Sequence, residues 1–154
     1  MGLIDVLSTY KRVALDTDIF MYAFNKHPEH GQTIKKMFEL IEQGELTACT
    51  STLALSEVLI DPIQEGKHDI EKTIKLYFKH FPNLTISPVN NEISERAAHL
   101  KVTHNINVRD ALFLSTAIIS GSNAFITTDN RFADVTEISC INLNELISEN
   151  SEIL

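Results

Sequence analysis

Cysteine, long apolar runs and targeting segments are scarce or missing in this sequence. Its two cysteines, Cys49 and Cys140, each come at the end of a predicted strand, and we expect both to be reduced thiols of a cytoplasmic protein. No apolar run approaches the roughly 20 residues that a membrane-spanning helix needs. The N-terminus lacks a basic segment followed by an apolar one, so the sequence predicts no signal peptide and no membrane association.

Positive charge and glycine are also in short supply. The formal net charge is −8, which argues against a broad face that binds nucleic acid. The negative net charge does not exclude a nuclease, provided that the acids cluster in one site and bind metal ions. Those ions would then contact the phosphate of the substrate. The five glycines form no glycine-rich, phosphate-binding loop. Any chemistry based on acidic residues therefore has to be local.

The chain does contain an alternation of strands and helices over 154 residues, enough for one domain with a sizeable core. Short apolar runs predict strands, and segments with apolar residues at helical spacing separate them. Such alternation is typical of a parallel sheet covered by helices on both faces, an α/β fold with three α/β/α layers. Four strands are expected at 13–15, 46–49, 84–86 and 124–127, with a candidate fifth at 138–141.

The first strand, residues 13–15, runs directly into Asp16-Thr17-Asp18. A buried helix follows at once, and we expect Thr17 or Asp18 to cap it. In open α/β sheets, ligands bind just beyond the carboxyl ends of the strands. Asp16 therefore stands where this architecture places chemistry.

Three further acids stand where charge is unexpected. Glu57 lies in a short apolar helix, residues 53–60, which we expect to end at Pro62. Asp110 opens a nearly all-apolar helix, where it also gains from the helix dipole. Asp129 follows an apolar strand, which places it at the same end of the sheet as the first motif.

Each of these acids alone has an ordinary interpretation, as a helix cap, a residue on a solvated helix edge or a turn residue. However, charged side chains are almost never fully buried unless they are paired or bind a metal. Converging on one pocket, the four would repel one another until pKa values rise or divalent cations enter. Ligands that are all oxygen favour Mg²⁺ or Mn²⁺. The acids concerned are Asp16, Glu57, Asp110 and Asp129.

In this order and context the acids resemble the motifs of the PIN-domain family of metal-dependent nucleases. The resemblance covers about residues 12–147, so residues 1–154 are identified as a single PIN-like domain. It implies a parallel sheet of four or five strands, frequent homodimers and, for many small members, VapC-type toxins that a cognate antitoxin inhibits. The matching motifs are Asp16-Thr17-Asp18, Ser56-Glu57, Asp110-Ala111 and Thr127-Thr128-Asp129-Asn130-Arg131-Phe132.

The resemblance also implies a reaction, the hydrolysis of phosphodiester bonds in single-stranded RNA to give a 5′-phosphate product. Asp16 and Asp110 would be the main ligands of Mg²⁺ or Mn²⁺. Glu57 would complete the shell or take the proton from water, and Asp129 would position the metal or a water. These four acids are thus the predicted catalytic and metal-binding residues.

Several neighbouring side chains belong to the predicted site or border it. Thr127 is expected to support the acids as a hydrogen-bond donor, and Asp18 stands where the family commonly has Asn and adds charge at the edge. Basic residues beside the motifs either steer phosphates or are solvated surface charge. They are Lys11, Arg12, Arg109 and Arg131.

Two other functions fit part of the pattern. The apolar run followed by Asp16-x-Asp18 also resembles the nucleophile loop of haloacid-dehalogenase-type phosphatases, in which the first Asp becomes phosphorylated. That family needs a downstream Lys and a paired-acid motif, which Asp129-Asn130 imitates poorly. Alternatively, the domain keeps its acids but serves as an RNA- or protein-binding scaffold without catalysis.

Overall fold

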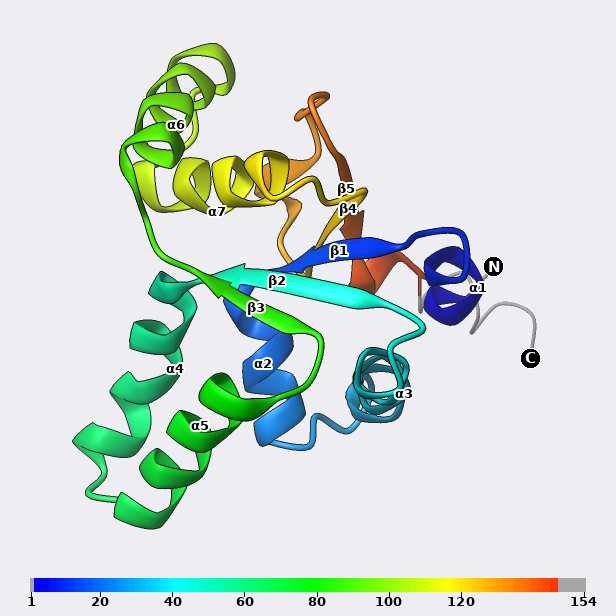
Figure 1. The fold of residues 1–154 in the computed structure, drawn as a ribbon, viewed down its shortest axis with the longest axis vertical. Coiled ribbons are helices and arrows are strands. Elements are labelled where there is room, and N and C mark those ends of the chain that lie inside the picture. The colour runs from blue at the N-terminus through cyan, green and yellow to red at the C-terminus, as the bar shows by residue number, and fades with distance from the viewer. Residues whose placement is uncertain (1, 147–154) are drawn as a thin grey trace.

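A parallel five-stranded sheet forms the centre of the structure (Figure 1). The computed structural model describes residues 2–146, so the end of the predicted domain, residues 147–154, lies outside them. The strands stand in the order β3-β2-β1-β4-β5 and every neighbouring pair is parallel, which confirms the expected sheet with its fifth strand. Their bounds are β1 Arg12–Leu15, β2 Thr47–Ser51, β3 Leu84–Ser87, β4 Ala124–Thr127 and β5 Ser139–Asn142.

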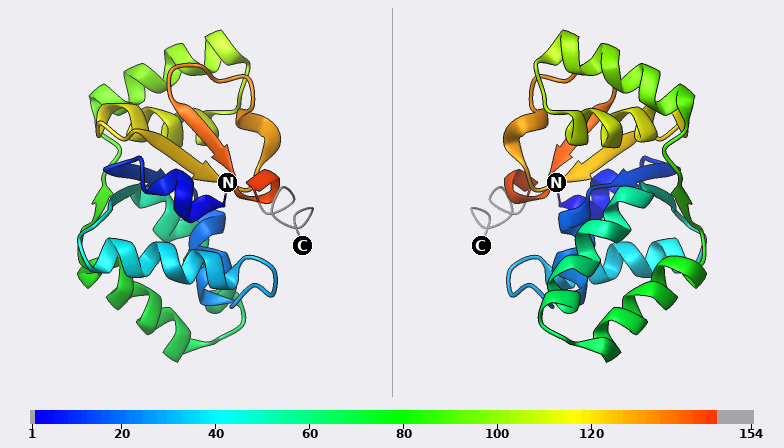
Figure 2. Two further views of the ribbon diagram at one scale, coloured as in Figure 1. Left: turned by 90° about the vertical axis from the view of Figure 1, so that its right-hand side faces the viewer. Right: turned by 90° about the vertical axis from the view of Figure 1, so that its left-hand side faces the viewer.

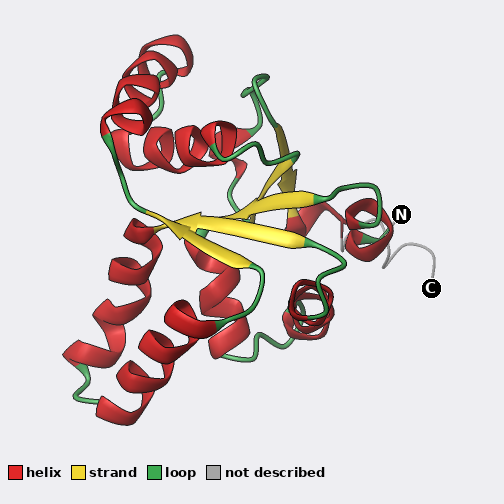
Figure 3. Ribbon diagram, in the orientation of Figure 1, coloured by secondary structure: helices red, strands yellow, loops and turns green. Residues whose placement is uncertain are grey.

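Helices cover both faces of the sheet, so the predicted three-layer α/β/α arrangement is confirmed (Figure 3). Helices α6 and α7 lie on one face and α2, α3, α4 and α5 on the other, and the side views of Figure 2 show the same separation. Within residues 2–146, no helix is both long and apolar enough to cross a membrane. The helices are α1 Leu3–Leu7, α2 Thr17–Phe24, α3 Gly31–Glu42, α4 Thr52–Gln64, α5 His68–His80, α6 Asn91–His104 and α7 Val108–Ile119.

The central strands β1 and β4 are buried on both faces, as their unbroken apolar sequences predict. Val13 and Leu15 in β1 and Phe125 and Ile126 in β4 are fully shielded from solvent. The edge strands β3 and β5 are only partly buried. The strands that carry the first and last acidic motifs therefore lie side by side in the middle of the sheet.

Helix α4 differs from its prediction at its C-terminal end. It was expected to end at Pro62 but continues to Gln64. The last turn closes because the Glu65 N–H donates to the Asp61 carbonyl oxygen at 2.9 Å, although Pro62 itself has no N–H to donate. The Pro62 ring is buried, which offsets the missing hydrogen bond. Glu57 consequently lies in the interior of a longer helix.

An aromatic cluster fixes α2, the helix that follows the first acidic motif. The Phe20 ring is fully buried, with centroids 5.7 Å from the Phe38 ring of α3 and 4.8 Å from the Phe78 ring of α5. Such aromatic pairs add to the free energy gained by burying the rings. This packing holds the start of α2 in place against the sheet.

Replacing Phe20 with Ala should therefore lower the free energy of unfolding by about 3–5 kcal/mol, because a large cavity forms between three helices. Urea denaturation followed by circular dichroism measures this change. Val102→Ala is the control, since Val102 on α6 is 84% exposed and its truncation should change stability by less than about 0.5 kcal/mol. Equal stability of the two variants would contradict the central role of this cluster.

Candidate active site

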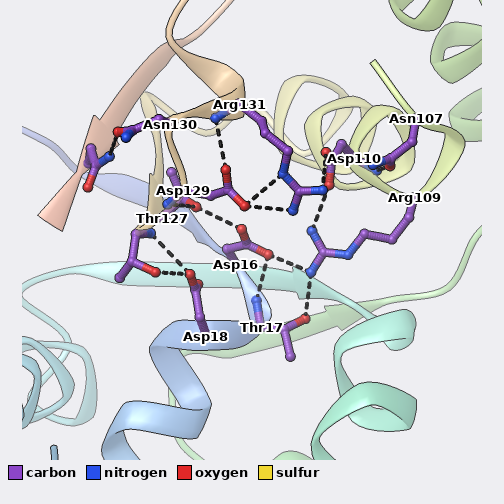
Figure 4. Close-up of polar contacts among 12 residues, drawn as sticks. Asp16, Thr17, Asp18, Asn107, Arg109, Asp110, Thr127, Asp129, Asn130 and Arg131 are labelled. Atoms are coloured by element: carbon purple, nitrogen blue, oxygen red, sulfur yellow. Dashed lines mark hydrogen bonds and ion pairs between the residues drawn. The ribbon is translucent and has the colours of Figure 1, made fainter. Parts of the chain in front are cut away.

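The acids collect at the end of the sheet where the chain switches sides. β1 is flanked by β2 and β4, and the crevice at such a switch point is where open α/β sheets bind ligands. Asp16 directly follows β1, and Asp129 comes just after β4. In Figure 4 these two acids and Asp110 turn toward one another, with arginine side chains between them.

Asp16 is both a helix cap and a member of this cluster. Its Oδ1 accepts a hydrogen bond from the Thr17 N–H at 2.8 Å, so Asp16, rather than Thr17 or Asp18 as expected, is the N-cap of α2. Its Oδ2 accepts one from Thr127 Oγ1 at 2.8 Å. The residue is only 2% exposed, so these donors compensate part of the cost of burying a carboxylate. The support expected from Thr127 is thus present in the structure.

One arginine, Arg109, contacts three of the predicted acids at once, and Figure 4 shows its contacts with two of them, Asp16 and Asp110. Its Nη2 lies 2.7 Å from Asp16 Oδ1 and 3.0 Å from Glu57 Oε1, and its Nη1 lies 3.0 Å from Asp110 Oδ1. Burial acts against the charged guanidinium, but the charge of Asp16 and hydrogen bonds to the carboxylates outweigh it and raise the pKa of Arg109. A permanent cation therefore stands where these acids meet.

Asp110 is the most enclosed acid of the cluster, at 1% exposure. It lies in the first turn of α7, where its N–H donates to Oδ1 of Asn107, the N-cap of the helix, at 2.8 Å. While Oδ1 accepts from Arg109, its buried Oδ2 accepts no hydrogen bond from any of residues 2–146. That oxygen forms an ion pair with Arg131, whose Nη1 lies 3.2 Å away. One oxygen of Asp110 therefore has a cationic partner but no hydrogen-bond donor in the described part of the chain.

Glu57 reaches the cluster from α4 and is more exposed than Asp16 and Asp110, with 36% of its side chain accessible. Its Oε1 accepts a hydrogen bond from Thr17 Oγ1 at 2.8 Å, and Arg109 Nε approaches both carboxylate oxygens at 3.2 and 3.3 Å. The middle residue of the first motif thus orients an acid of the second. No local pattern indicates this role, because the two residues are 40 positions apart.

The carboxylate of Asp129 joins the other acids through a second arginine. Arg131 Nη2 pairs with Asp129 Oδ2 at 2.6 Å, while its Nη1 faces Asp110. The hydrogen bond from Arg131 is the main cause of a lowered pKa for Asp129. Asp129 also caps the short 3₁₀ helix Asn130–Phe132 by accepting from the Arg131 N–H at 2.8 Å. Asp129 is therefore a turn residue and also lies beside the other acids.

Asp18 lies at the edge of the cluster and faces the loop after β4. Its Oδ2 accepts hydrogen bonds from the Thr128 N–H, at 3.1 Å, and from the Thr128 hydroxyl. Burial and the nearby charge of Asp16 raise the pKa of Asp18 to about 6. Asp18 therefore takes up a proton closer to neutral pH than a free aspartate does.

The chemical type of these side chains fits a hard divalent cation, because carboxylate oxygens are the ligands that Mg²⁺ and Mn²⁺ prefer. The buried Oδ2 of Asp110, which has no hydrogen-bond donor among the described residues, points the same way. In the arrangement described for residues 2–146, however, no three acidic, histidine or cysteine side chains are placed to hold a metal ion. Asp16, Glu57, Asp110 and Asp129 each face an arginine instead.

A cleft of about 510 Å³ opens onto this cluster. Arg109, which the sequence placed only beside a motif, lies on its wall, whereas the buried Asp110 does not. The charged residues that line the cleft are Asp16, Asp18, Glu57, Asp61, Arg109, Asp129 and Arg131.

Comparison with known proteins agrees with these motifs. Residues 13–138, most of the chain, match the family described as the PIN domain. The chain belongs to the PIN-domain family. No curated protein matches the sequence of this PIN domain.

Solved structures share the fold of this PIN domain at low sequence identity. VapBC2 from Rickettsia felis, bound to a DNA fragment from their promoter, has a TM-score of 0.69 and 20% identity over 85% of this chain and 98% of that chain. VapC20 from Mycobacterium tuberculosis, a sarcin–ricin-loop-cleaving toxin, has a TM-score of 0.64 and 17% identity over 82% of this chain and 98% of that chain. A toxin–antitoxin complex from Klebsiella pneumoniae has a TM-score of 0.63 and 20% identity over 82% of this chain and 94% of that chain. At these identities the similarity establishes the fold alone.

Replacing Thr127 with Val tests how much the PIN domain depends on this buried network. The substitution keeps the shape but leaves Asp16 Oδ2 without its donor and the Asp129 N–H without its acceptor. We expect the free energy of unfolding, measured in urea, to fall by about 1–3 kcal/mol.

The matched control is Thr116→Val. Thr116 is equally buried, but its hydroxyl donates only to the Leu112 carbonyl oxygen within its own helix, so the change should stay within about 0.5 kcal/mol. If both valine variants lose the same free energy, Thr127 does not support Asp16 in the way described.

Proposed function

We propose that this protein is a Mg²⁺- or Mn²⁺-dependent ribonuclease that hydrolyses phosphodiester bonds in single-stranded RNA. One observation carries the proposal. The guanidinium of Arg109 lies within 3.0 Å of Asp16, Glu57 and Asp110, so acids from three distant segments reach a single cation-sized position. Membership of the PIN-domain family supports the same chemistry.

In this proposal Asp16 and Asp110 are the main ligands of the metal, and Glu57 and Asp129 complete the site. A bound divalent ion would lower the pKa of water and offset the charge of the scissile phosphate. Thr127 holds Asp16 in place through its 2.8 Å hydrogen bond. Asp16 thereby keeps a fixed position without having to reorganise when substrate arrives.

Glu57 is the acid best suited to accept a proton from the attacking water. It lies on the wall of the cleft, whereas Asp110 is enclosed, so a water molecule has direct access to its carboxylate. The hydrogen bond from the Thr17 hydroxyl orients the carboxylate, which is what a positioned general base requires.

We further propose that the protein is the toxin of a toxin–antitoxin pair and forms a homodimer. The fold neighbours, which include VapBC2 and another toxin–antitoxin complex, support the toxin role. The homodimer rests only on membership of the PIN-domain family. The RNA substrate is supported by the fold neighbour VapC20, which is a sarcin–ricin-loop-cleaving toxin.

The alternatives from the sequence fare differently. A phosphorylated Asp16 needs a free attacking oxygen, yet Oδ1 is held by Arg109 and the Thr17 N–H and Oδ2 by Thr127. A silent RNA- or protein-binding scaffold is favoured by one observation, the arginine partners that all four acids already have. The cleavage experiment below separates the scaffold from the enzyme.

The test is cleavage of mixed single-stranded RNA oligonucleotides with added Mg²⁺ or Mn²⁺ and with a chelator. We expect 5′-phosphorylated fragments that disappear with the chelator. Asp16→Asn and Asp110→Asn should each lower the rate by about 100-fold or more while RNA binding persists, because both remove a charge without changing size.

Asp134→Asn is the matched control, since it makes the same change at an exposed residue outside the cleft and should cleave like the wild type. No cleavage of any RNA or DNA by the wild type would exclude the enzyme and favour the scaffold. Cleavage that survives in Asp16→Asn would show that this cluster is not the active site.

A further inference from the structure

Arg109 occupies the position at which the proposed metal ligands converge. We propose that Arg109 is a built-in counter-ion of the acid cluster, and that a divalent cation binds only by displacing its guanidinium. The inference rests on the proposed metal site and adds a positioning residue to it, because Arg109 controls access to the acids without being a ligand itself.

The first support is that the arginine and a metal would use the same oxygens. Arg109 takes Oδ1 of Asp16, Oδ1 of Asp110 and both oxygens of Glu57. A carboxylate oxygen that faces a guanidinium N–H at hydrogen-bond distance does not also face a metal ion on that side. This competition accounts for the absence, among residues 2–146, of three acids placed to hold an ion.

The second support is the enclosure of Asp110 behind the two arginines. Arg109 and Arg131 line the cleft and each pairs with one Asp110 oxygen, at 3.0 and 3.2 Å, while Asp110 itself is 1% exposed and does not line the cleft. Its Oδ2 is buried and accepts no hydrogen bond. An ion entering from the cleft therefore reaches Asp110 only when an arginine moves aside.

The third support is that Arg109 is the more exposed partner of the pair that it forms with Asp16. Asp16 is held by Thr127 and by the start of α2, and 3% of its side chain is exposed, whereas 30% of the Arg109 side chain is exposed toward the open cleft. Arg109 also packs over the Phe113 ring, 4.1 Å from its centroid, one turn along the same helix. That contact holds the arginine without tying it to the acids.

Simple electrostatics favours the exchange. A guanidinium brings one charge spread over a plane, with its nitrogens at 2.7–3.0 Å from the oxygens of Asp16, Glu57 and Asp110. A divalent ion brings two charges and approaches oxygens to about 2.1 Å. The cluster, with Asp18 and Asp129, still has more carboxylates than guanidinium groups, so it gains from the additional positive charge.

The test is Mn²⁺ binding measured by calorimetry without RNA, on the full chain. We expect Arg109→Gln to bind Mn²⁺ at least about tenfold more tightly than the wild type, because the competing cation is gone. Arg96→Gln is the matched control. It removes the same charge from an exposed position on α6, and its affinity for Mn²⁺ should equal that of the wild type.

A second measurement uses the unmodified protein and so does not depend on the folding of a variant. In ¹⁵N spectra of the wild type, the Arg109 Nε–H signal should shift and lose its protection from solvent exchange as Mg²⁺ is added. The Arg96 signal should stay unchanged. This readout follows displacement directly, whether or not RNA is cleaved.

Equal Mn²⁺ affinity of the wild type and Arg109→Gln would overturn the proposal, as would an Arg109 signal that stays constant while Mg²⁺ binds. If metal-dependent cleavage occurs in either case, the proposed function survives and only the counter-ion role is wrong. If neither protein binds Mn²⁺ and no RNA is cleaved, both proposals fail together.

Discussion

The buried carboxylate of Asp16 sets the central constraint of this structure. A carboxylate that is 2% exposed has lost most of its hydration and needs donors and cations in its place. The Thr17 N–H, the Thr127 hydroxyl and the Arg109 guanidinium supply them. Because Arg109 must also serve Glu57 and Asp110, the position of each acid depends on the same cation.

The sheet makes this concentration of charge possible. β1 and β4 pair in parallel, with Leu15 opposite Ile126, so the residues that follow them emerge side by side. Asp16 and Asp110 both lie at helix N-termini, where unpaired N–H groups and the helix dipole favour negative charge. The backbone therefore gathers the acids and also lowers part of the cost of keeping them ionised.

The balance of carboxylates and guanidinium groups relates the proposed metal site to the proposed counter-ion role of Arg109. A cluster left without any cation would either protonate or push its acids apart, as the raised pKa of Asp18 indicates at the edge. With Arg109 and Arg131 in place, four of these acids each have a cationic partner and lie close together. In the proposed mechanism, an internal guanidinium keeps the acids in place when no divalent ion is bound, and it competes with that ion for their oxygens.

Much of the fold and of the candidate site could be predicted from local sequence. Apolar runs and helical spacing predicted the parallel sheet and its covering helices, because burial on two faces requires apolar residues throughout β1 and β4. Acids in apolar surroundings indicated the acids of the candidate site, because a charge in such a place needs a specific reason. Thr127 was implied only by the resemblance of its motif to that of the PIN-domain family.

Only the tertiary structure decided how those members are paired. Whether Arg109 lies in solvent or between Asp16 and Glu57 depends on contacts across 93 and 52 positions, and no local pattern encodes such distances. The same is true of the hydroxyl of Thr17 on Glu57 and of the continuation of α4 past Pro62, which depends on burial of the ring. Local sequence determined which residues carry charge and which elements carry them; the packing of those elements determined which charge meets which.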